Sequence, residues 1–358
     1  MTASTSADSS AQRWRAVLGS SQGYIGLVLI LVIGIWSQGA RFMDLSNLTN
    51  AVGYFAPRGI LAVGMTLVIV AGGIDLSVGA LLAVGSTTAA WLLTQGNWPV
   101  GAIIPVSMLI GAAFGFINGL GTAKLRIQAF VMTLAMMTIA RGIVREFSHN
   151  VSIGTIVVDA NGAVAPGSQQ FRMLGTPGTS LFDVPLIGYF PVLALLLVVV
   201  IFQLILSRTT FGRHVYAVGG NPTAARLSGV NVDWVIIAVF TLSGLLAGLA
   251  GPISAAYNAS ADPQAGLTYE LDAIAAVVIG GASLAGGRGS VVGTAVGALI
   301  LTLLDNVLGL NNFSANWQMI IKGLIVVAAV VLQQPQLFSN AFARLGRRAK
   351  VPAAQGGD

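Results

Sequence analysis

The sequence has no cysteine, few charged residues and two histidines among its 358 residues. The absence of cysteine excludes disulfides, thiolate metal sites and cysteine nucleophiles. The two histidines, His149 and His214, are too few for a three-histidine metal site and lie beside charged loops. Charged residues make up 8% of the chain, whereas soluble domains carry roughly a quarter. The composition is therefore not that of a soluble globular protein.

Hydrophobic residues, by contrast, make up 55% of the chain, and the mean hydropathy is +0.83. The 45 glycines also fit a membrane protein, because glycine is more frequent in membrane helices than in soluble ones. The net charge of +6 comes from Lys and Arg at the ends of apolar stretches, so it indicates membrane orientation and no nucleic-acid partner. We expect an all-α polytopic membrane protein surrounded by a lipid bilayer.

Ten stretches are apolar enough to cross a bilayer, which takes about 20 residues as a helix. The eighth stretch is short and interrupted by glycine. The predicted spans lie at residues 22–40, 50–72, 76–95, 99–121, 127–146, 188–207, 234–256, 270–284, 289–309 and 315–333. An even number of spans puts both termini on the same side of the membrane.

The placement of Arg and Lys predicts the orientation, because cytoplasmic loops carry an excess of both. With the N-terminus inside, twelve of these residues fall in inner loops and tails and three in outer loops. Both termini are therefore expected in the cytoplasm. Residues 1–40 have the basic start and apolar run of a cleaved signal peptide, but the run is long and no A-x-A-like site follows Trp36. We interpret this segment as a retained first span.

Hydrophilic segments divide the chain further. Residues 1–20 are expected to be a disordered cytoplasmic tail, 21–335 the transmembrane domain and 336–358 a basic cytoplasmic tail. An outer segment, 147–187, is rich in Gly, Pro, Ser and Asp and is either a solvated loop or a partly ordered cap. An inner segment, 208–233, reads RTTFGRHVYAVGGNPTAARLSGVNVD and carries clearer structural signals.

The inner segment contains start and stop signals for a short helix. Asn221 is a favoured N-cap, Pro222 suits the first helical position, and Gly229 suits the position after a helix end. The residues between them, TAARLS, include good helix formers. A helix of about two turns is predicted on the cytoplasmic surface, either as a packing element between two spans or as a contact for another protein.

The same segment carries a resemblance to a known family. The string GRHVYAVGGNPTAARLSGVNV resembles the coupling loop of the permease subunits of bacterial ABC sugar importers of the ribose, xylose and autoinducer-2 type. Three other segments match that family: AGGIDLSVGALLAVGS at 71–86, NGLGTAKLRIQAFVMTLAMMTIARG at 118–142 and YELDAIAAVVIGGASLAGGRGSVVGTAVGALIL at 269–301. The resemblance runs from about residue 20 to 335 and is specific for the family rather than for the substrate.

The resemblance implies the ABC importer permease fold and a membrane-spanning subunit that translocates a monosaccharide or related polyol. Its partners would be an ABC ATPase subunit, a periplasmic sugar-binding protein, and a second copy of the chain or a related permease. The chain would lie in the bacterial inner membrane and bind no cofactor or metal, with ATP and Mg on the partner ATPase. The coupling helix that docks on the ATPase would comprise Asn221, Pro222, Thr223, Ala224, Ala225, Arg226, Leu227, Ser228 and Gly229.

The residues themselves also indicate a separate ATPase. A phosphate-binding P-loop requires the motif G-x-x-x-x-G-K-[ST]. The lysines of the chain are Lys124, Lys322 and Lys350, and they are followed by Leu, Gly and Val. The sequence therefore contains no P-loop, and nucleotide energy must reach the chain through contact with another protein.

Polar residues beside the apolar runs are candidates for the solute path. Asp75 and Ser77 lie in the turn GGIDLSVG, where Gly72 and Gly73 let the backbone bend. Asp75 is interpreted either as an N-cap of the next helix or as part of a moving inner gate. Amide and hydroxyl groups that suit a sugar are offered by Asn118, Gln128, Thr133, Thr138, Ser243, Asn258 and Asn306.

Two glycine-rich turns indicate that the chain consists of two related halves. AGGIDLSVG at 71–79 and AGGRGSVVG at 285–293 align almost end to end. Asn118 would then correspond to Asn306, and Phe130 to a tryptophan in the last span. Transporters often contain such repeats, with the solute path at their junction. We therefore expect a weak internal repeat and include Phe130 among the path candidates.

Charged groups within spans are costly in hydrocarbon and mark candidate functional residues. Asp305 lies in the ninth predicted span and Lys322 in the tenth, and we predict an ion pair that lowers the cost of both. Arg58 and Arg141 are interpreted as residues near span ends whose long side chains reach water.

Two other functions fit parts of the sequence. An ion-coupled secondary carrier needs several carboxylates or histidines along a path, whereas Asp75 and Asp305 are two isolated Asp residues at or within the predicted spans. The second function is a branched-chain amino acid ABC permease, which is a relative of the sugar group. In such a permease the N-terminus of a half-helix would point at the substrate carboxylate, and the turn at 72–77 can be interpreted in this way. The sugar importer is preferred because the matching strings are closer to that branch.

Overall fold

The structure, a computed structural model, describes residues 24–158, 161–175 and 189–332. The predicted tails, 1–20 and 336–358, lie outside these residues. After a helix at Tyr24–Gln38, the elements are α2 (Ala40–Met43), α3 (Leu45–Val70), α4 (Val78–Thr94), α5 (Val100–Ala123), α6 (Ala129–Phe147), β1 (Ile153–Gly154), α7 (Pro166–Arg172), α8 (Phe190–Arg208), α9 (Thr210–Gly220), α10 (Pro222–Leu227), α11 (Val232–Tyr257), β2 (Ser260–Ala261), α12 (Tyr269–Ile279), α13 (Val291–Leu310) and α14 (Ala315–Leu332).

The chain divides into two units, Met1–Phe313 and Ser314–Asp358. A helix occupies at least part of every stretch that the sequence marks as a span. Within the described residues, five helices have the length and hydropathy of a membrane span: α3, α5, α8, α11 and α13. The chain is therefore a mostly helical, multi-pass membrane protein.

The eighth predicted span, 270–284, is wrong in length. Helix α12 ends at Ile279 after 11 residues, a rise of about 17 Å against a hydrocarbon core of about 30 Å. The amide of Gly281 donates to the Val278 carbonyl (3.0 Å), and Gly281 has a φ of +89°. α12 is thus a half-helix, followed by irregular backbone up to Ser290, the N-cap of α13.

Helix α3 ends in the same way as α12. The amide of Gly72 donates to the Ile69 carbonyl (2.9 Å), and Gly72 has a φ of +89°. This left-handed conformation strains any residue with a Cβ, so both helix ends require glycine. The ends of α3 and α12 therefore share one local geometry, although the two helices have 26 and 11 residues and Gly281 lies before the segment 285–293 that aligns with 71–79.

The core of the first unit contains a close contact between α5 and α11. Gly111 and Gly115 on α5 face Gly244 and Gly248 on α11, and a Cβ at any of the four would overlap backbone atoms of the facing helix. Small residues let membrane helices approach closely and gain van der Waals contact. Helices α3 and α4 also pack against α11, so α11 is the central helix of this unit.

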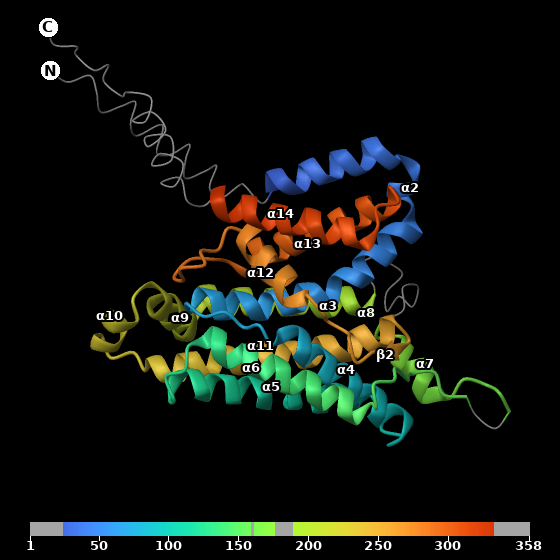
Figure 1. Cartoon of the computed structure of the whole chain (residues 1–358), viewed down its shortest axis with the longest axis horizontal. Coiled ribbons are helices and arrows are strands. Elements are labelled where there is room, and N and C mark those ends of the chain that lie inside the picture. The colour runs from blue at the N-terminus through green and yellow to red at the C-terminus, as the bar shows by residue number, and fades with distance from the viewer. Residues whose placement is uncertain (1–23, 159–160, 176–188, 333–358) are drawn as a thin grey trace, which may run out of the picture. The chain divides into compact units, whose positions relative to one another are not determined.

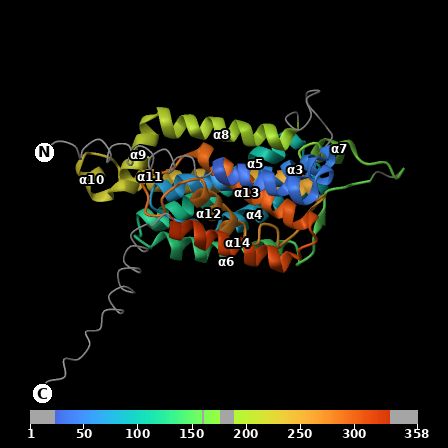
Figure 2. The same ribbon diagram turned by 90° about the horizontal axis from the view of Figure 1, so that it is seen from above.

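The long helices of the first unit run in similar directions in both views (Figures 1 and 2). Helices α9 and α10 lie at one end of this unit, and α7 lies at the opposite end. The short strands β1 and β2 pair in antiparallel fashion, and β2 lies at the α7 end (Figure 1). The segments around 147–175 and 208–233 are therefore at opposite ends, as the predicted topology requires.

The described part of the predicted outer segment, 147–158 and 161–175, contains residues that are buried against the helices, which a fully solvated loop would not show. Phe171 of α7 is fully buried, and Leu174 is 6% exposed. Both belong to an apolar cluster with Leu93 at the end of α4. Residues 176–187 of the predicted segment lie outside the described residues.

Candidate functional site

Helix α10 has the start and stop that the sequence predicts. The Asn221 side chain accepts a hydrogen bond from the amide of Ala224 (2.9 Å), and Pro222 occupies the first helical position. Gly229 has a φ of +85°, and the amide of Val230 donates to a carbonyl of the last turn (3.0 Å). These caps satisfy backbone groups that a short helix otherwise leaves without partners.

Helix α10 is exposed over most of its surface. Eight of the nine predicted coupling residues are exposed, and Leu227 is 85% exposed. The carboxylate of Asp233 on α11 accepts hydrogen bonds from Arg226 (2.9 Å) and from Lys124 after α5 (3.0 Å). Exposed ion pairs contribute about 0–1 kcal/mol to the free energy of unfolding. The Arg226–Asp233 pair therefore orients α10 more than it stabilises the fold. An apolar side chain on a capped, exposed helix is suited to a groove on another protein.

The sequence did not predict α9, the helix before α10. The Thr209 hydroxyl caps it by accepting a hydrogen bond from the amide of Gly212 (3.2 Å). Val215 and Val218 are buried along one side. The helix was missed because several glycines lower the helix propensity of this segment. A threonine N-cap followed by valines at helical spacing was the signal that could have found it.

Helix α9 connects α10 to the glycine turns that follow α3 and α12. Gly219 lies so close to Val70 that a Cβ there would overlap the Val70 carbonyl oxygen. The same oxygen accepts a hydrogen bond from the amide of Gly287, in the loop before α13 (2.9 Å). The Tyr216 hydroxyl donates to the Gly289 carbonyl in that loop (2.7 Å). Helix α9 is therefore in close contact with both the end of α3 and the loop before α13.

Five predicted path residues meet in one buried network. The Asp75 carboxylate accepts hydrogen bonds from the hydroxyls of Ser77 (2.6 Å) and Ser243 (2.9 Å). The Asn118 amide donates to the Ser77 hydroxyl (2.9 Å). The Thr133 hydroxyl accepts from a backbone amide of the same turn (3.1 Å). The network joins the turn before α4 to α5, α6 and α11.

The network is closed to solvent. Asp75, Ser77 and Asn118 are 0% exposed. Asp75 also accepts a hydrogen bond from the amide of Ser77 (2.9 Å). Ser77, and not Asp75, occupies the N-cap position of α4, so Asp75 orders the turn before the helix and does not cap the helix as the N-cap interpretation expected. Buried polar groups of this kind hold membrane helices together. In this conformation the network therefore fixes the turn and does not line an open passage.

The side chains of Asn306 and Phe130 do not take part in this network. The side-chain amides of Asn306 on α13 and Asn47 on α3 donate to one another (2.8 and 3.1 Å). Phe130, near the start of α6, is 46% exposed. Gly72 and Gly73 form the turn after α3. The structure thus brings together the polar residues around Asp75, places Phe130 one turn before Thr133 on α6, and places Asn306 in a separate contact with Asn47.

Arg58 was predicted near a span end, and this prediction is wrong. It lies in the middle of α3 with 11% of its side chain exposed, and its Nη1 donates to the Asp305 carboxylate on α13 (2.8 Å). Its Nη2 donates to the Tyr54 hydroxyl. The guanidinium lies 3.8 Å from the ring centroid of Tyr54 and 4.5 Å from that of Tyr269. Arg58 is therefore a partner of Asp305 that the sequence did not predict.

The other charged residues of the spans have different surroundings. Lys322, the predicted partner of Asp305, belongs to α14 in the second unit, and the Asp305–Lys322 pair stays a prediction. Nη1 of Arg141 donates to the carbonyls of Pro263 and Ala265 (3.1 and 2.6 Å). Arg141 thus binds the loop before α12, an interaction that the prediction of a water-facing side chain missed.

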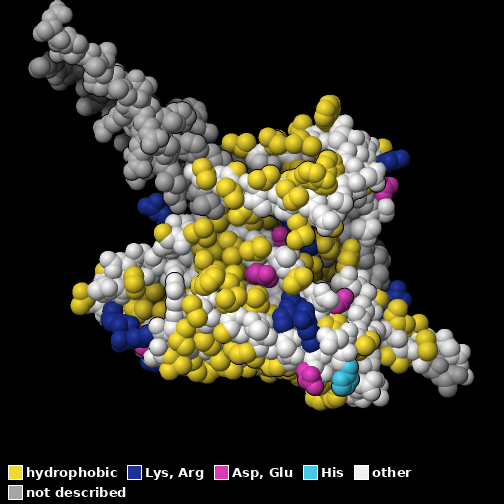
Figure 3. All heavy atoms as spheres, in the orientation of Figure 1, with side chains coloured by type: hydrophobic (Ala, Val, Ile, Leu, Met, Phe, Trp, Pro, Cys, Tyr) yellow, Lys and Arg dark blue, Asp and Glu magenta, His cyan; other side chains and the backbone are white. Residues whose placement is uncertain are grey.

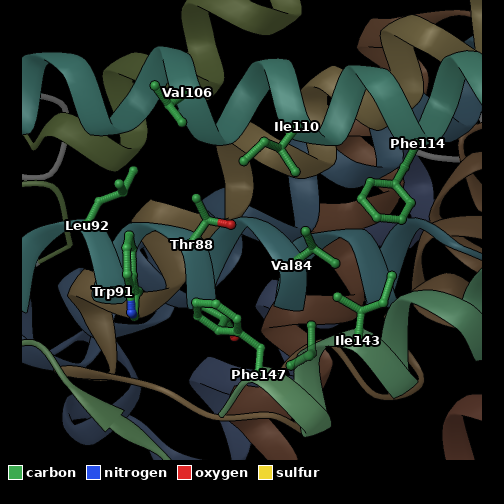
Figure 4. Close-up of a pocket in the computed structure, with 11 residues that line it drawn as sticks. Val84, Thr88, Trp91, Leu92, Val106, Ile110, Phe114, Ile143 and Phe147 are labelled. Carbon is green, nitrogen blue, oxygen red and sulfur yellow. The ribbon is translucent and has the colours of Figure 1, made fainter. Parts of the chain in front are cut away.

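A cavity of about 300 Å³ lies between α4, α5 and α6 (Figure 4). Its walls include Val84 and Trp91 on α4, Ile110 and Phe114 on α5, and Phe147 on α6. Few of its lining groups form hydrogen bonds, so a polyol placed there would lose hydrogen bonds that it makes with water. The cavity suits an apolar molecule and not a polar solute.

The structure has the features of a membrane transport protein. These are several apolar spans, polar side chains that join helices within the bundle, and an exposed capped helix at one end. Comparison with known families agrees with this class. Residues 47–330 match the family described as branched-chain amino acid transport system / permease component. The chain belongs to this family of permeases.

Its relatives include permeases with named substrates. The ribose import permease protein of Escherichia coli K12 is 42% identical over 308 residues, which are 86% of this chain and 90% of the relative. The ribose import permease protein of Haemophilus influenzae is 40% identical over 85% of this chain and 90% of its own length. The xylose transport system permease protein of E. coli K12 is 33% identical over 85% of this chain and 88% of its own length. No solved structure matches the chain significantly. The chain is a permease subunit rather than an enzyme.

Proposed function

We propose that this chain is the membrane-spanning subunit of an ATP-driven importer for a monosaccharide or related polyol. The observation that carries the proposal is 42% identity to a ribose import permease over 86% of this chain. Similarity to xylose transport permeases adds support for a sugar. A periplasmic sugar-binding protein would deliver the solute. The chain would lie in the bacterial inner membrane with both termini in the cytoplasm.

The force for transport would come from a separate ABC ATPase that holds ATP and Mg and docks on residues 221–229. Two observations support this role: Leu227 is exposed on α10, and α9 contacts the end of α3 through backbone atoms at Gly219 and Val70. ATP-driven closure of the ATPase would push α10 and α9 and shift the ends of α3 and α13. A second copy of the chain, or a related permease, would complete the assembly.

The turn at 72–77 would be part of the inner gate. Its network around Asp75 would have to open for a solute to pass, and hydroxyl and amide groups can exchange hydrogen bonds with a sugar at little cost. The chain would consist of two related halves with about ten spans in total, and the path would lie at their junction. The alignment of 71–79 with 285–293 pairs Gly72 with Gly286, and both have a positive φ (+89° and +86°), which supports this repeat.

Reconstitution in lipid vesicles tests the function. The chain is combined with its ATPase and with binding protein loaded with radiolabelled ribose, xylose or leucine. We expect ATP-dependent accumulation of a monosaccharide only when all components are present, and no effect of a protonophore at constant ATP. Accumulation against a gradient by the chain alone would contradict the proposal and indicate a secondary carrier.

A branched-chain amino acid is the second candidate substrate, because the description of the matched family names this class. The sugar is preferred because relatives that match this chain over most of their length are ribose and xylose permeases. ATP-dependent uptake of leucine, with no uptake of either sugar, would assign the second function instead.

A further inference from the structure

Three tyrosines from three helices meet around Arg58. Tyr54 lies one turn before Arg58 on α3, Tyr257 ends α11, and Tyr269 begins α12. The Tyr54 and Tyr257 ring centroids are 6.3 Å apart, with an angle of 48° between the rings. The Arg58 guanidinium lies over the rings of Tyr54 and Tyr269. Segments that are far apart in the sequence thus bring aromatic rings to one place.

The Arg58–Asp305 ion pair beside these rings joins α3 to α13 at a high cost in desolvation free energy. The side chains of Arg58 and Asp305 are 11% and 10% exposed, and Nε of Arg58 is buried and has no hydrogen-bond partner among the described residues. Desolvation of such a pair often exceeds its attraction, and apolar residues of similar volume pack as well or better. A buried charge in a membrane bundle therefore points to a function. Here the guanidinium orients two tyrosine rings and one tyrosine hydroxyl.

The tyrosine rings are accessible, although Arg58 is not. Tyr54 is 37% exposed, and Tyr257 and Tyr269 are partly exposed. By comparison, the network around Asp75 is closed. Figure 3 shows acidic and basic side chains that interrupt the hydrophobic surface near α3 and α12. The cluster therefore presents aromatic faces and polar groups together at an accessible surface of the first unit.

The cluster also lies beside a discontinuous helix. Tyr269 is the first residue of the half-helix α12, and Thr268 before it has a φ of +69°. Irregular backbone within a membrane is tolerated where it is buried in protein or lines a cavity, and transporters commonly hold their solute there. Tyr54 lies about 14 Å along α3 from Leu45, within the length of a helix that is long and apolar enough to cross a membrane.

We propose that Tyr54, Tyr257 and Tyr269 form an aromatic platform that contacts the sugar ring in the transport path, and that Arg58 is the residue that positions this platform. The C–H faces of a sugar ring stack on aromatic rings, and tyrosine hydroxyls exchange hydrogen bonds with sugar hydroxyls. The contact is weak enough for the solute to leave. This inference rests on the proposed function, because it names the groups by which the path of a sugar importer recognises its solute.

The test uses the complete importer in vesicles with saturating binding protein loaded with radiolabelled ribose. Tyr269→Leu and Tyr257→Leu should each lower uptake up to about tenfold, while the ATPase rate stimulated by loaded binding protein stays within about twofold. Tyr269→Phe should retain most of the uptake because it keeps the ring. Arg58→Lys should behave like Tyr269→Leu, because lysine cannot reproduce the planar stacking of arginine.

Trp91→Leu is the matched control, since Trp91 is 41% exposed and lies on α4 at the apolar cavity. The proposal is overturned if Tyr269→Leu and Tyr257→Leu transport like Trp91→Leu, or if Tyr269→Phe loses as much uptake as Tyr269→Leu. It is also overturned if uptake, ATPase stimulation and the amount of folded protein fall together, as a merely structural role would require. A wild-type importer that accumulates no sugar overturns the proposed function, and this inference with it. Sugar uptake that the leucine variants leave unchanged overturns this inference alone.

Discussion

Polar and charged residues within the bundle are held by partners that are distant in the sequence. Arg58 and Asp305 are 247 positions apart, and Asp75 and Ser243 are 168 positions apart. A polar group without a partner costs several kcal/mol in hydrocarbon, so each of these residues needs another. The sequence identifies the residues that carry this cost, but the partner depends on which helices become neighbours.

Asp305→Asn should destabilise the protein, because it leaves the Arg58 guanidinium buried without its carboxylate. Loss of one member of a buried pair costs about 3–5 kcal/mol. The midpoint of thermal unfolding of the purified protein in detergent should fall accordingly. The double variant Arg58→Met/Asp305→Leu removes both charges and should recover most of the loss. A double variant as unstable as Asp305→Asn would show that the pair does not act through charge compensation.

The predicted pair of Asp305 and Lys322 has its own test. Neutralisation by Asp305→Asn or Lys322→Gln should reduce uptake, and the exchange Asp305→Lys/Lys322→Asp should restore part of it if the two charges meet. The measurement is ATP-dependent uptake per folded protein in vesicles. An exchange variant that transports no better than either neutral variant would remove Lys322 as a partner of Asp305.

At the scale of elements, α10 is small and should matter for coupling rather than for folding. Arg226→Glu, or deletion of 222–228, should uncouple uptake from ATP hydrolysis while membrane insertion persists, because α10 is exposed and packs little with the bundle. Uptake and ATP hydrolysis are measured in the same vesicles. Arg172→Glu on α7 makes the same charge reversal at the opposite end of the unit and should leave coupling intact. Normal transport in both α10 variants would remove the coupling role.

The close glycine contact between α5 and α11 should contribute to the free energy of unfolding. Gly244→Ala introduces a Cβ that overlaps the Gly111 carbonyl, so the two helices must separate. Overpacking of this kind typically costs about 1–3 kcal/mol. Gly142→Ala on α6 is the control, because a Cβ there meets no atom within 4 Å. We expect thermal unfolding at a lower temperature for Gly244→Ala alone, and equal unfolding of both variants would contradict the close contact.

At the scale of the whole molecule, the orientation in the membrane can be tested directly, because the sequence has no cysteine to remove. Thr223→Cys on α10 should react with a membrane-impermeant maleimide only after the cytoplasmic side is opened. Gln170→Cys on α7 should react in intact cells whose outer membrane is permeabilised. The reverse pattern would place the termini outside, and labelling of both positions from one side would contradict the predicted topology.

The sequence by itself determined roughly where the long apolar helices lie and how α10 begins and ends, but not α9. In lipid an apolar run must form a helix, because the backbone has no other hydrogen-bond partners. The caps at Asn221 and Gly229 are local and act within one or two turns. The prediction failed at α12, because glycine and alanine keep the hydropathy high after the helix has already ended at Ile279.

Only the tertiary structure decided which residues meet. The packing of α5 against α11 brings four glycines together, and the packing of α13 and α12 against α3 joins Arg58 to Asp305 and places three tyrosines around them. It also brings Gly219 of α9 onto the end of α3. The physical reason is that helix formation is a local property of the chain, whereas the partner of a buried charge or of a glycine depends on distances across the bundle.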